Sequence, residues 1–219
     1  MTYSIIDISQ PVSSKTACFP GDTPFSRQVT LRLEKGATVN LTSFTMSPHV
    51  GTHADAPSHI QGCMEDSAGM ASTMALLPYI GPCAVLDVSA GSGGITPELF
   101  QRAAERLKEL PPRVVFKTQK KLRFDVWEGA EYSHFTVDLI EAMKGRGVIL
   151  AGLDTPSVDH VDSKDLQVHH AMIKAGFSWL ENLDLTDAEE GLYFLCAAPL
   201  KLTELEASPV RAVLIKDLL

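Results

Sequence analysis

The first half of the chain alternates short strand-like segments with turns. Polar and hydrophobic residues alternate over residues 29–33 and 41–46, which predicts two half-exposed strands. Residues 19–24 hold two prolines together with glycine and aspartate. Because proline cannot donate a hydrogen bond to a neighbouring strand, this segment is predicted to be a turn.

From about residue 84 onward, buried apolar runs alternate with helical patterns. Five apolar runs predict short buried strands, at residues 84–88, 114–117, 148–152, 192–196 and 210–215. Three helices are predicted between some of them: from Thr96, with Pro97 at the first helical position, to about Leu110, from near Thr136 to Gly145, and from near Ser163 to Gly176. This order predicts an α/β fold in which helices cover a mixed sheet.

Composition and charge narrow the class of protein. The chain has 219 residues, 45% of them hydrophobic, and no visible linker, so we expect one domain over residues 1–219. The net charge of −8 argues against nucleic acid and anionic membrane surfaces as partners, since both favour basic patches. The first residues lack the pattern of a signal peptide, and four cysteines without C-x-x-C pairing suit a reducing compartment, so we expect a cytoplasmic location.

Candidate chemistry is concentrated in residues 49–59, which contain His49, His53, Asp55 and His59. Imidazole and carboxylate groups together suit zinc, manganese or iron. A straight strand rises about 3.3 Å per residue, so His49 and Asp55 would lie roughly 20 Å apart in one. A shared metal centre therefore requires a bend, and Gly51 is the residue that can adopt it. The alternative, scattered polar residues on a surface loop, explains this density of ligand types less well.

The segment His49-Val-Gly-Thr-His-Ala-Asp-Ala-Pro-Ser-His59 resembles the H-x-G-T-H-x-D-A-P-x-H signature of the cyclase-like metal-dependent hydrolases. The best-known branch of that family is the bacterial kynurenine formamidases. Blocks at residues 6–11, 20–24, 154–159, 199–202 and 208–213 extend the resemblance over essentially the whole chain. It implies a swivelling β/β/α fold, a homodimer, and two divalent ions per subunit, zinc first and manganese as the alternative.

The resemblance also implies a role for each site residue. The implied metal ligands are His49, His53, Asp55, His169 and Glu181, with Asp55 bridging the two ions. His59 stays off the ions and carries a proton to the departing amine, while an activated water attacks the amide carbonyl.

The residues alone leave the second half of the site open. His169 and His170 fall on the predicted apolar face of the third helix, together with Leu166 and Ile173, and a histidine there is more often a core residue than a ligand. Glu181 lies among apolar residues, where a buried carboxylate needs a partner such as a cation. We interpret His160 as incidental and His134 as a loop or lid residue; a role for His170 stays open.

The implied reaction is the hydrolysis of a small aryl formamide, N-formyl-L-kynurenine, to L-kynurenine and formate in tryptophan degradation. Phe19 stands where the related enzymes usually carry a tryptophan that packs on the substrate ring, and phenylalanine offers less area and no indole N–H. Another aryl or cyclic amide, of the kind that isatin hydrolases open, is therefore the alternative substrate. A catalytically silent metal-binding protein is a third possibility, but this chain retains every implied ligand and His59.

Overall fold

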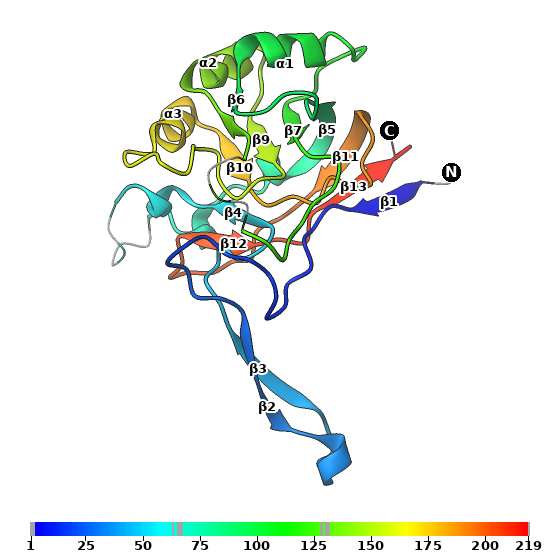
Figure 1. Ribbon diagram of the computed structural model, residues 1–219, viewed down its shortest axis with the longest axis vertical. Coiled ribbons are helices and arrows are strands. Elements are labelled where there is room, and N and C mark those ends of the chain that lie inside the picture. Colours follow the sequence, from blue (N-terminus) through cyan, green and yellow to red (C-terminus); the bar gives the residue numbers. More distant parts are fainter. Residues whose placement is uncertain (1–2, 63, 65–67, 128, 130–131, 219) are drawn as a thin grey trace.

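The computed structural model describes residues 3–62, 64, 68–127, 129 and 132–218. A seven-stranded mixed sheet forms its centre (Figure 1). In spatial order the strands are β1 (Ser4–Asp7), β13 (Val213–Lys216), β11 (Gly191–Cys196), β5 (Ile80–Asp87), β7 (Arg113–Lys117), β9 (Leu150–Leu153) and β10 (Ser178–Leu180). The strands from β5 to β10 run parallel, and the remaining neighbours pair antiparallel.

Three helices connect the parallel strands and lie together on one face of the sheet (Figure 1). They are α1 (Pro97–Ala104), α2 (Val137–Gly145) and α3 (Gln167–Ala175). Their apolar sides bury a core against the strands, with Phe100, Phe116, Leu139, Met172 and Trp179 among its members. The predicted α/β fold, a mixed sheet with helical cover, is confirmed.

The other face of the sheet is covered by a second, smaller sheet. β4 (His53–Asp55) pairs antiparallel with β12 (Ala207–Pro209), and all three residues of β4 are buried. Ala54 packs there in a second core with Val85, Leu180 and Leu214. This packing holds the 49–59 segment against the end of β10. A further short pair, β6 (Gly94–Ile95) with β8 (His134–Phe135), lies near the helices.

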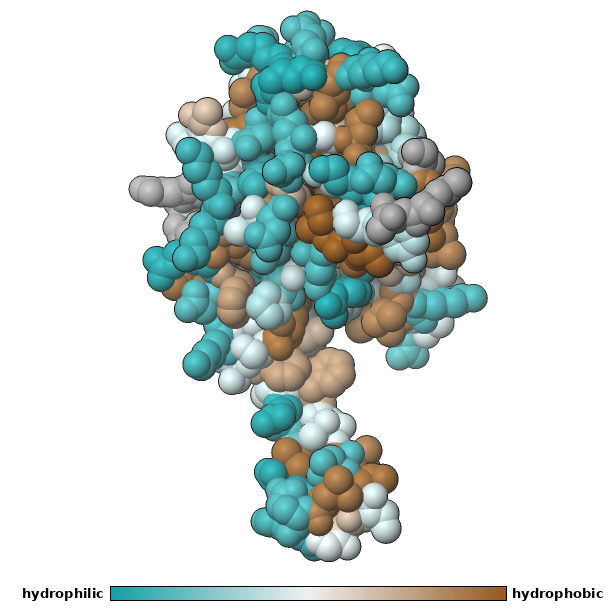
Figure 2. Space-filling model, turned by 90° about the vertical axis from the view of Figure 1, so that its right-hand side faces the viewer, coloured by the Kyte–Doolittle hydropathy of each residue, from teal (hydrophilic) through white to brown (hydrophobic). Residues whose placement is uncertain are grey.

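One hairpin leaves the body of the protein. β2 (Ser26–Leu31) and β3 (Leu41–Thr45) pair antiparallel and extend well beyond the remaining elements (Figure 1). We call residues 25–45 the arm. Hydrophobic side chains gather at its far end (Figure 2), where Leu31, Leu33, Val39 and Leu41 are exposed. Phe44 is exposed nearer the body, where it pairs with Arg27. A two-stranded hairpin is marginally stable on its own in water, so this exposed surface calls for an explanation.

Element boundaries differ from the predictions at several points. The first helix was expected to reach about Leu110 but ends at Ala104, where Arg106 turns to bind Glu190 (Nε–Oε1 2.8 Å) and the carbonyl of Asp87. The third begins four residues later than Ser163 because Leu166 has a left-handed backbone, with φ +45°. The strands predicted at residues 29–33 and 210–215 begin at Ser26 and Val213. No helix among the described residues is long and apolar enough to cross a membrane.

Candidate metal centre

The 49–59 segment bends at Gly51, as the sequence requires. Gly51 has φ +73°, a conformation that favours glycine, and a Cβ built there would lie only 2.7 Å from Cγ2 of Val12. The bend brings Nδ1 of His49 to 3.1 Å from Oδ1 of Asp55. The 20 Å separation of a straight strand is thereby removed.

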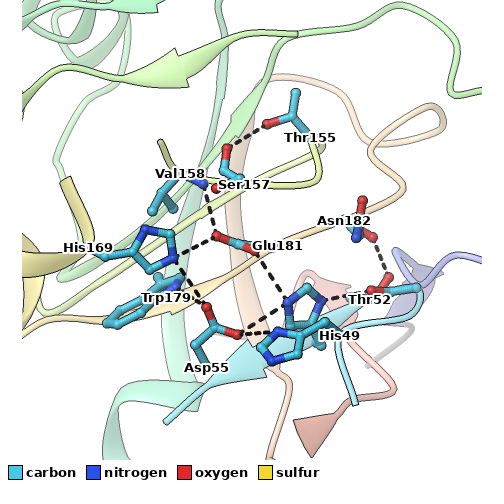
Figure 3. A network of polar contacts seen from close by, with 12 residues as sticks. His49, Thr52, Asp55, Thr155, Ser157, Val158, His169, Trp179, Glu181 and Asn182 are labelled. Carbon is cyan, nitrogen blue, oxygen red and sulfur yellow. Dashed lines mark hydrogen bonds and ion pairs between the residues drawn. The ribbon is translucent and has the colours of Figure 1, made fainter. Parts of the chain in front are cut away.

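The second half of the site comes from the end of β10 and from α3. The backbones of His53 and Glu181 pair, with N···O distances of 3.2 and 3.1 Å, so the residue that follows β10 is held against β4. His169 enters from the first turns of α3. All five sequence-predicted ligands therefore meet in one place (Figure 3).

Asp55 lies at the centre of this cluster. Its Oδ1 is 3.2 Å from Nε2 of His53, while its Oδ2 is 3.4 Å from Nε2 of His169. Glu181 spans the same two rings, at 3.3 Å from His53 and 3.7 Å from His169. The two oxygens of Asp55 thus face different histidines.

Each of the three histidines predicted as ligands is held through the ring nitrogen that does not face the centre of the cluster. Nδ1 of His53 donates to the carbonyl oxygen of Gly51 at 2.9 Å, since a carbonyl can only accept. Nδ1 of His169 donates to Asp159 at 2.6 Å, and Nε2 of His49 lies 3.4 Å from Glu206. Such outer partners fix the tautomer and direct the free nitrogen inward. The sequence analysis did not identify Asp159 or Glu206, because only the fold shows which rings they meet.

Two further donors complete the surroundings of the carboxylates. The indole Nε1 of Trp179 donates to Oδ2 of Asp55 at 3.1 Å, and the backbone N of Val158 donates to Oε1 of Glu181 at 2.9 Å (Figure 3). Trp179 was also missed by the sequence analysis. Its side chain is almost fully buried, as expected for an aromatic residue, and nothing in the sequence indicates a polar contact.

The electrostatics of the cluster favour positive charge. Burial by itself lowers the pKa of His53, but the Asp55 and Glu181 carboxylates beside its ring outweigh burial and raise that pKa to about 10. The same competition raises the pKa of His169 to about 10, through Asp159 and Asp55, and that of His49 to about 9. Burial raises the pKa of Asp55, yet its three histidines hold it well below the usual value.

A divalent cation fits this arrangement. His53 Nε2, Asp55 Oδ1 and His169 Nε2 are buried and lack a hydrogen-bond partner within the described part of the chain. Buried polar atoms without partners are costly, and a metal ion would satisfy all three. Two overlapping sets of ligand atoms lie within 4.8 Å of one another: His49, Asp55 and His59, and His53, Asp55 and Glu181. Asp55 belongs to both sets.

His59 lies beside the cluster, and within the described part of the chain its ring makes no hydrogen bond to Asp55 or Glu181. Its ring centroid is 4.5 Å from that of His49 and 5.7 Å from that of His169. Burial lowers the pKa of His59, so its imidazole is neutral near pH 7. A neutral imidazole next to the predicted ligands can accept a proton, and it can also bind a metal.

The cluster opens into a cavity of about 300 Å³, large enough for a small molecule. Phe19, the predicted substrate-binding residue, lines the cavity, and Trp127 meets it edge to face with ring centroids 5.0 Å apart. The sequence analysis did not find Trp127. His170 is exposed on α3 and lies outside the cavity lining, so the predicted apolar face of that helix was wrong at this position, while His169 on the same predicted face is buried. His134 and His160 pair with each other, 4.9 Å apart, and do not line the cavity either.

Comparison with known proteins gives a consistent family. Residues 6–160 match the family model described as "Putative cyclase". The kynurenine formamidase of Bordetella pertussis is 43% identical over 208 residues, which cover 95% of this chain and 96% of that protein. An isatin hydrolase bound to thioisatinate has a similar fold, with a TM-score of 0.83, 20% identity and coverage of 97% and 92% of the two chains. A predicted metal-dependent hydrolase from Bacillus stearothermophilus matches at a TM-score of 0.79 and 23% identity, over 98% of this chain and 99% of its own. The chain therefore belongs to the cyclase family.

Proposed function

We propose that this protein is a metal-dependent arylformamidase that hydrolyses N-formyl-L-kynurenine to L-kynurenine and formate. The observation that carries the proposal is the convergence of His53, Asp55, His169 and Glu181, all buried, at a cavity sized for a small aromatic molecule. The 43% identity to a kynurenine formamidase over almost the full length of both chains supports this substrate.

The proposed cofactor is a pair of divalent ions, zinc first and manganese as the alternative. His49, His53 and Asp55 would hold one ion, and Asp55, His169 and Glu181 the other. The opposed contacts of the two Asp55 oxygens support a bridging role. When bound, the ions would supply Lewis-acid polarisation of the amide carbonyl and an activated water.

The protein's own side chains complete the proposed reaction. His59, neutral near pH 7, takes a proton as the carbonyl is attacked and delivers it to the aryl amine as the C–N bond breaks. Phe19 and Trp127 offer an aromatic surface on which the substrate ring packs. Trp127 supplies the indole that is missing at position 19.

The proposed assembly is a homodimer in which the arm is covered by a second copy of the chain. Phe44 is 64% exposed and stacks only on Phe25 of the same arm among the aromatic contacts described. Burying this surface between two copies would stabilise a hairpin that is marginal by itself.

One experiment tests the central proposal. The purified protein is analysed for bound metal and then assayed with N-formyl-L-kynurenine and with isatin. We expect rapid hydrolysis of the formamide, loss of activity on chelation, and recovery with zinc or manganese. Preferential opening of isatin would favour the alternative substrate class. Full metal occupancy without hydrolysis of either compound would favour the silent metal-binding protein.

A further inference from the structure

A single permanent positive charge faces the cavity. Among the described residues that line it, Arg123 is the only lysine or arginine. The metal-ligand cluster at the base of the cavity does not use this residue. The guanidinium of Arg123 is therefore available to bind an anionic group of the substrate.

The backbone around Arg123 is anchored. Asp154 fixes the start of the segment by accepting hydrogen bonds from Thr118 N at 2.9 Å and Gln119 N at 3.1 Å. On either side of Arg123, the backbone N of Leu122 donates to Oγ1 of Thr186 at 3.2 Å, and the carbonyl of Phe124 accepts from Ala17 N at 2.8 Å. The position of Arg123 along the cavity wall is thus set by its neighbours.

The same wall carries the aromatic surface and an opposite charge. Trp127 ends the anchored segment and meets Phe19, whose carbonyl accepts from the backbone N of Asp22 at 3.0 Å. Asp22 also lines the cavity. Within the described ranges of the chain, no carboxylate lies at ion-pair distance from Arg123, Asp22 included. Two opposite charges therefore line the same cavity as the aromatic surface without pairing with each other.

We propose that Arg123 and Asp22 form a subsite for the free amino-acid end of the substrate, with Arg123 binding the α-carboxylate and Asp22 facing the α-ammonium group. This inference rests on the proposed function, because N-formyl-L-kynurenine carries such a zwitterion beyond its ring. The planar guanidinium matches a carboxylate with two parallel hydrogen bonds. Arg123 is then a specificity-determining residue that distinguishes amino-acid formamides from neutral ones.

The test compares two substrates that share the reacting group. N-formyl-L-kynurenine carries the zwitterion, and 2′-formamidoacetophenone keeps the ring, ketone and formamide without it. Full-length metal-loaded protein is assayed as wild type, Arg123→Met, Arg123→Lys and Lys121→Met. Lys121 is an exposed cation close by in the sequence that does not line the cavity, so its variant is the matched control.

We expect Arg123→Met to lower kcat/KM for N-formyl-L-kynurenine about ten-fold, mainly through KM, because a hydrogen-bonded charge partner is lost. The kcat/KM for the neutral compound should stay within about two-fold of the wild-type value, a difference that we treat as no effect. Arg123→Lys should fall in between, and Asp22→Asn should show a smaller loss confined to the zwitterion. Equal losses on both compounds, or none on either, would overturn the subsite while leaving formamide hydrolysis intact. If wild-type protein hydrolyses neither compound, the proposed function fails, and the subsite with it.

Discussion

Asp159 accepts a hydrogen bond from Nδ1 of His169 at 2.6 Å, and the same carboxylate accepts from the backbone N of His169 at 3.0 Å. One side chain therefore both accepts backbone hydrogen bonds from the first turn of α3 and orients a proposed metal ligand. The ring cannot rotate without breaking its hydrogen bond to the carboxylate that also binds the start of its helix.

Replacing Asp159 with Asn should weaken metal binding by about 10- to 100-fold, because the His169 ring loses its orienting anion. Zinc affinity measured by competition with a chelating dye checks this. Asp162→Asn, at a mostly exposed carboxylate close by, is the control and should bind zinc as the wild type does. Unchanged zinc affinity in Asp159→Asn would show that the ring is held by packing alone.

Replacing His59 with Ala should reduce kcat by about a hundred- to ten-thousand-fold, because the departing amine loses its proton donor. Metal content, measured by elemental analysis, should stay as in the wild type. Loss of metal together with activity would instead show that His59 is a metal ligand. Its ring nitrogen lies close enough to ligand atoms of His49 and Asp55 to share one ion with them.

The metal-free protein should lose stability as the pH rises. Folding raises the pKa of His49 from 6.5 to about 9 and that of His169 to about 10. A group whose pKa is raised by folding stabilises the folded protein fully at a pH below its pKa in the unfolded chain. That stabilisation is lost as the pH rises past its pKa in the folded protein. The midpoint temperature of thermal unfolding should therefore decrease as the pH is raised from 6.5 to 9 and above. Stabilisation by added zinc should grow over the same range, since binding displaces these protons.

Two variants separate this effect from general alkaline instability. His169→Gln should flatten part of the pH profile of the metal-free protein, while His170→Gln, at the exposed neighbouring position, should leave it unchanged. If the thermal midpoint of the metal-free wild-type protein does not change between pH 6.5 and pH 9, the raised pKa values of His49 and His169 are contradicted.

Gly51→Ala should destabilise the protein by about 2–4 kcal/mol, from a left-handed backbone combined with a clash against Val12. Urea unfolding of the metal-free protein measures this, and zinc content should fall with it. Gly36→Ala is the matched control: it has φ +81° but nothing within 4 Å of the new Cβ, so about 1 kcal/mol is expected. Adding Val12→Ala to Gly51→Ala should recover the clash component only.

Phe44→Ser should shift the protein from dimer to monomer if the arm forms the proposed contact between copies. Sedimentation at several protein concentrations measures the change. Leu77→Ser is the control, because Leu77 is 73% exposed on the body of the protein and away from the arm. A wild-type protein that sediments as a monomer throughout would contradict the proposed homodimer.

Local signals in the sequence were sufficient for some elements. The helix from Val137 to Gly145 follows its cap at Thr136 as predicted, and the bend at Gly51 follows from the spacing of His49 and Asp55. Both depend on residues that lie close together along the chain.

Long-range contacts account for what was missed. The strand Ser178–Leu180 is too short to be recognised by its pattern and exists because Leu150–Leu153 pairs with it. Glu206 and Trp127 have no local motif, and their roles arise only where His49 and Phe19 meet them. The buried residues of α3 are Val168, His169 and Met172, and this face depends on the packing of the helix against the sheet and α2.

The backbone pairing of His53 with Glu181 has a consequence for the order in which the protein folds and binds metal. The two segments it joins are far apart in the sequence, and such contacts form late because closing a long loop costs entropy. The ligand set is therefore incomplete in any partly folded chain. Metal loading should follow folding in this protein, unlike in zinc fingers, where the ion itself drives the chain to fold. An empty but folded apoprotein is thus the natural acceptor of the ion.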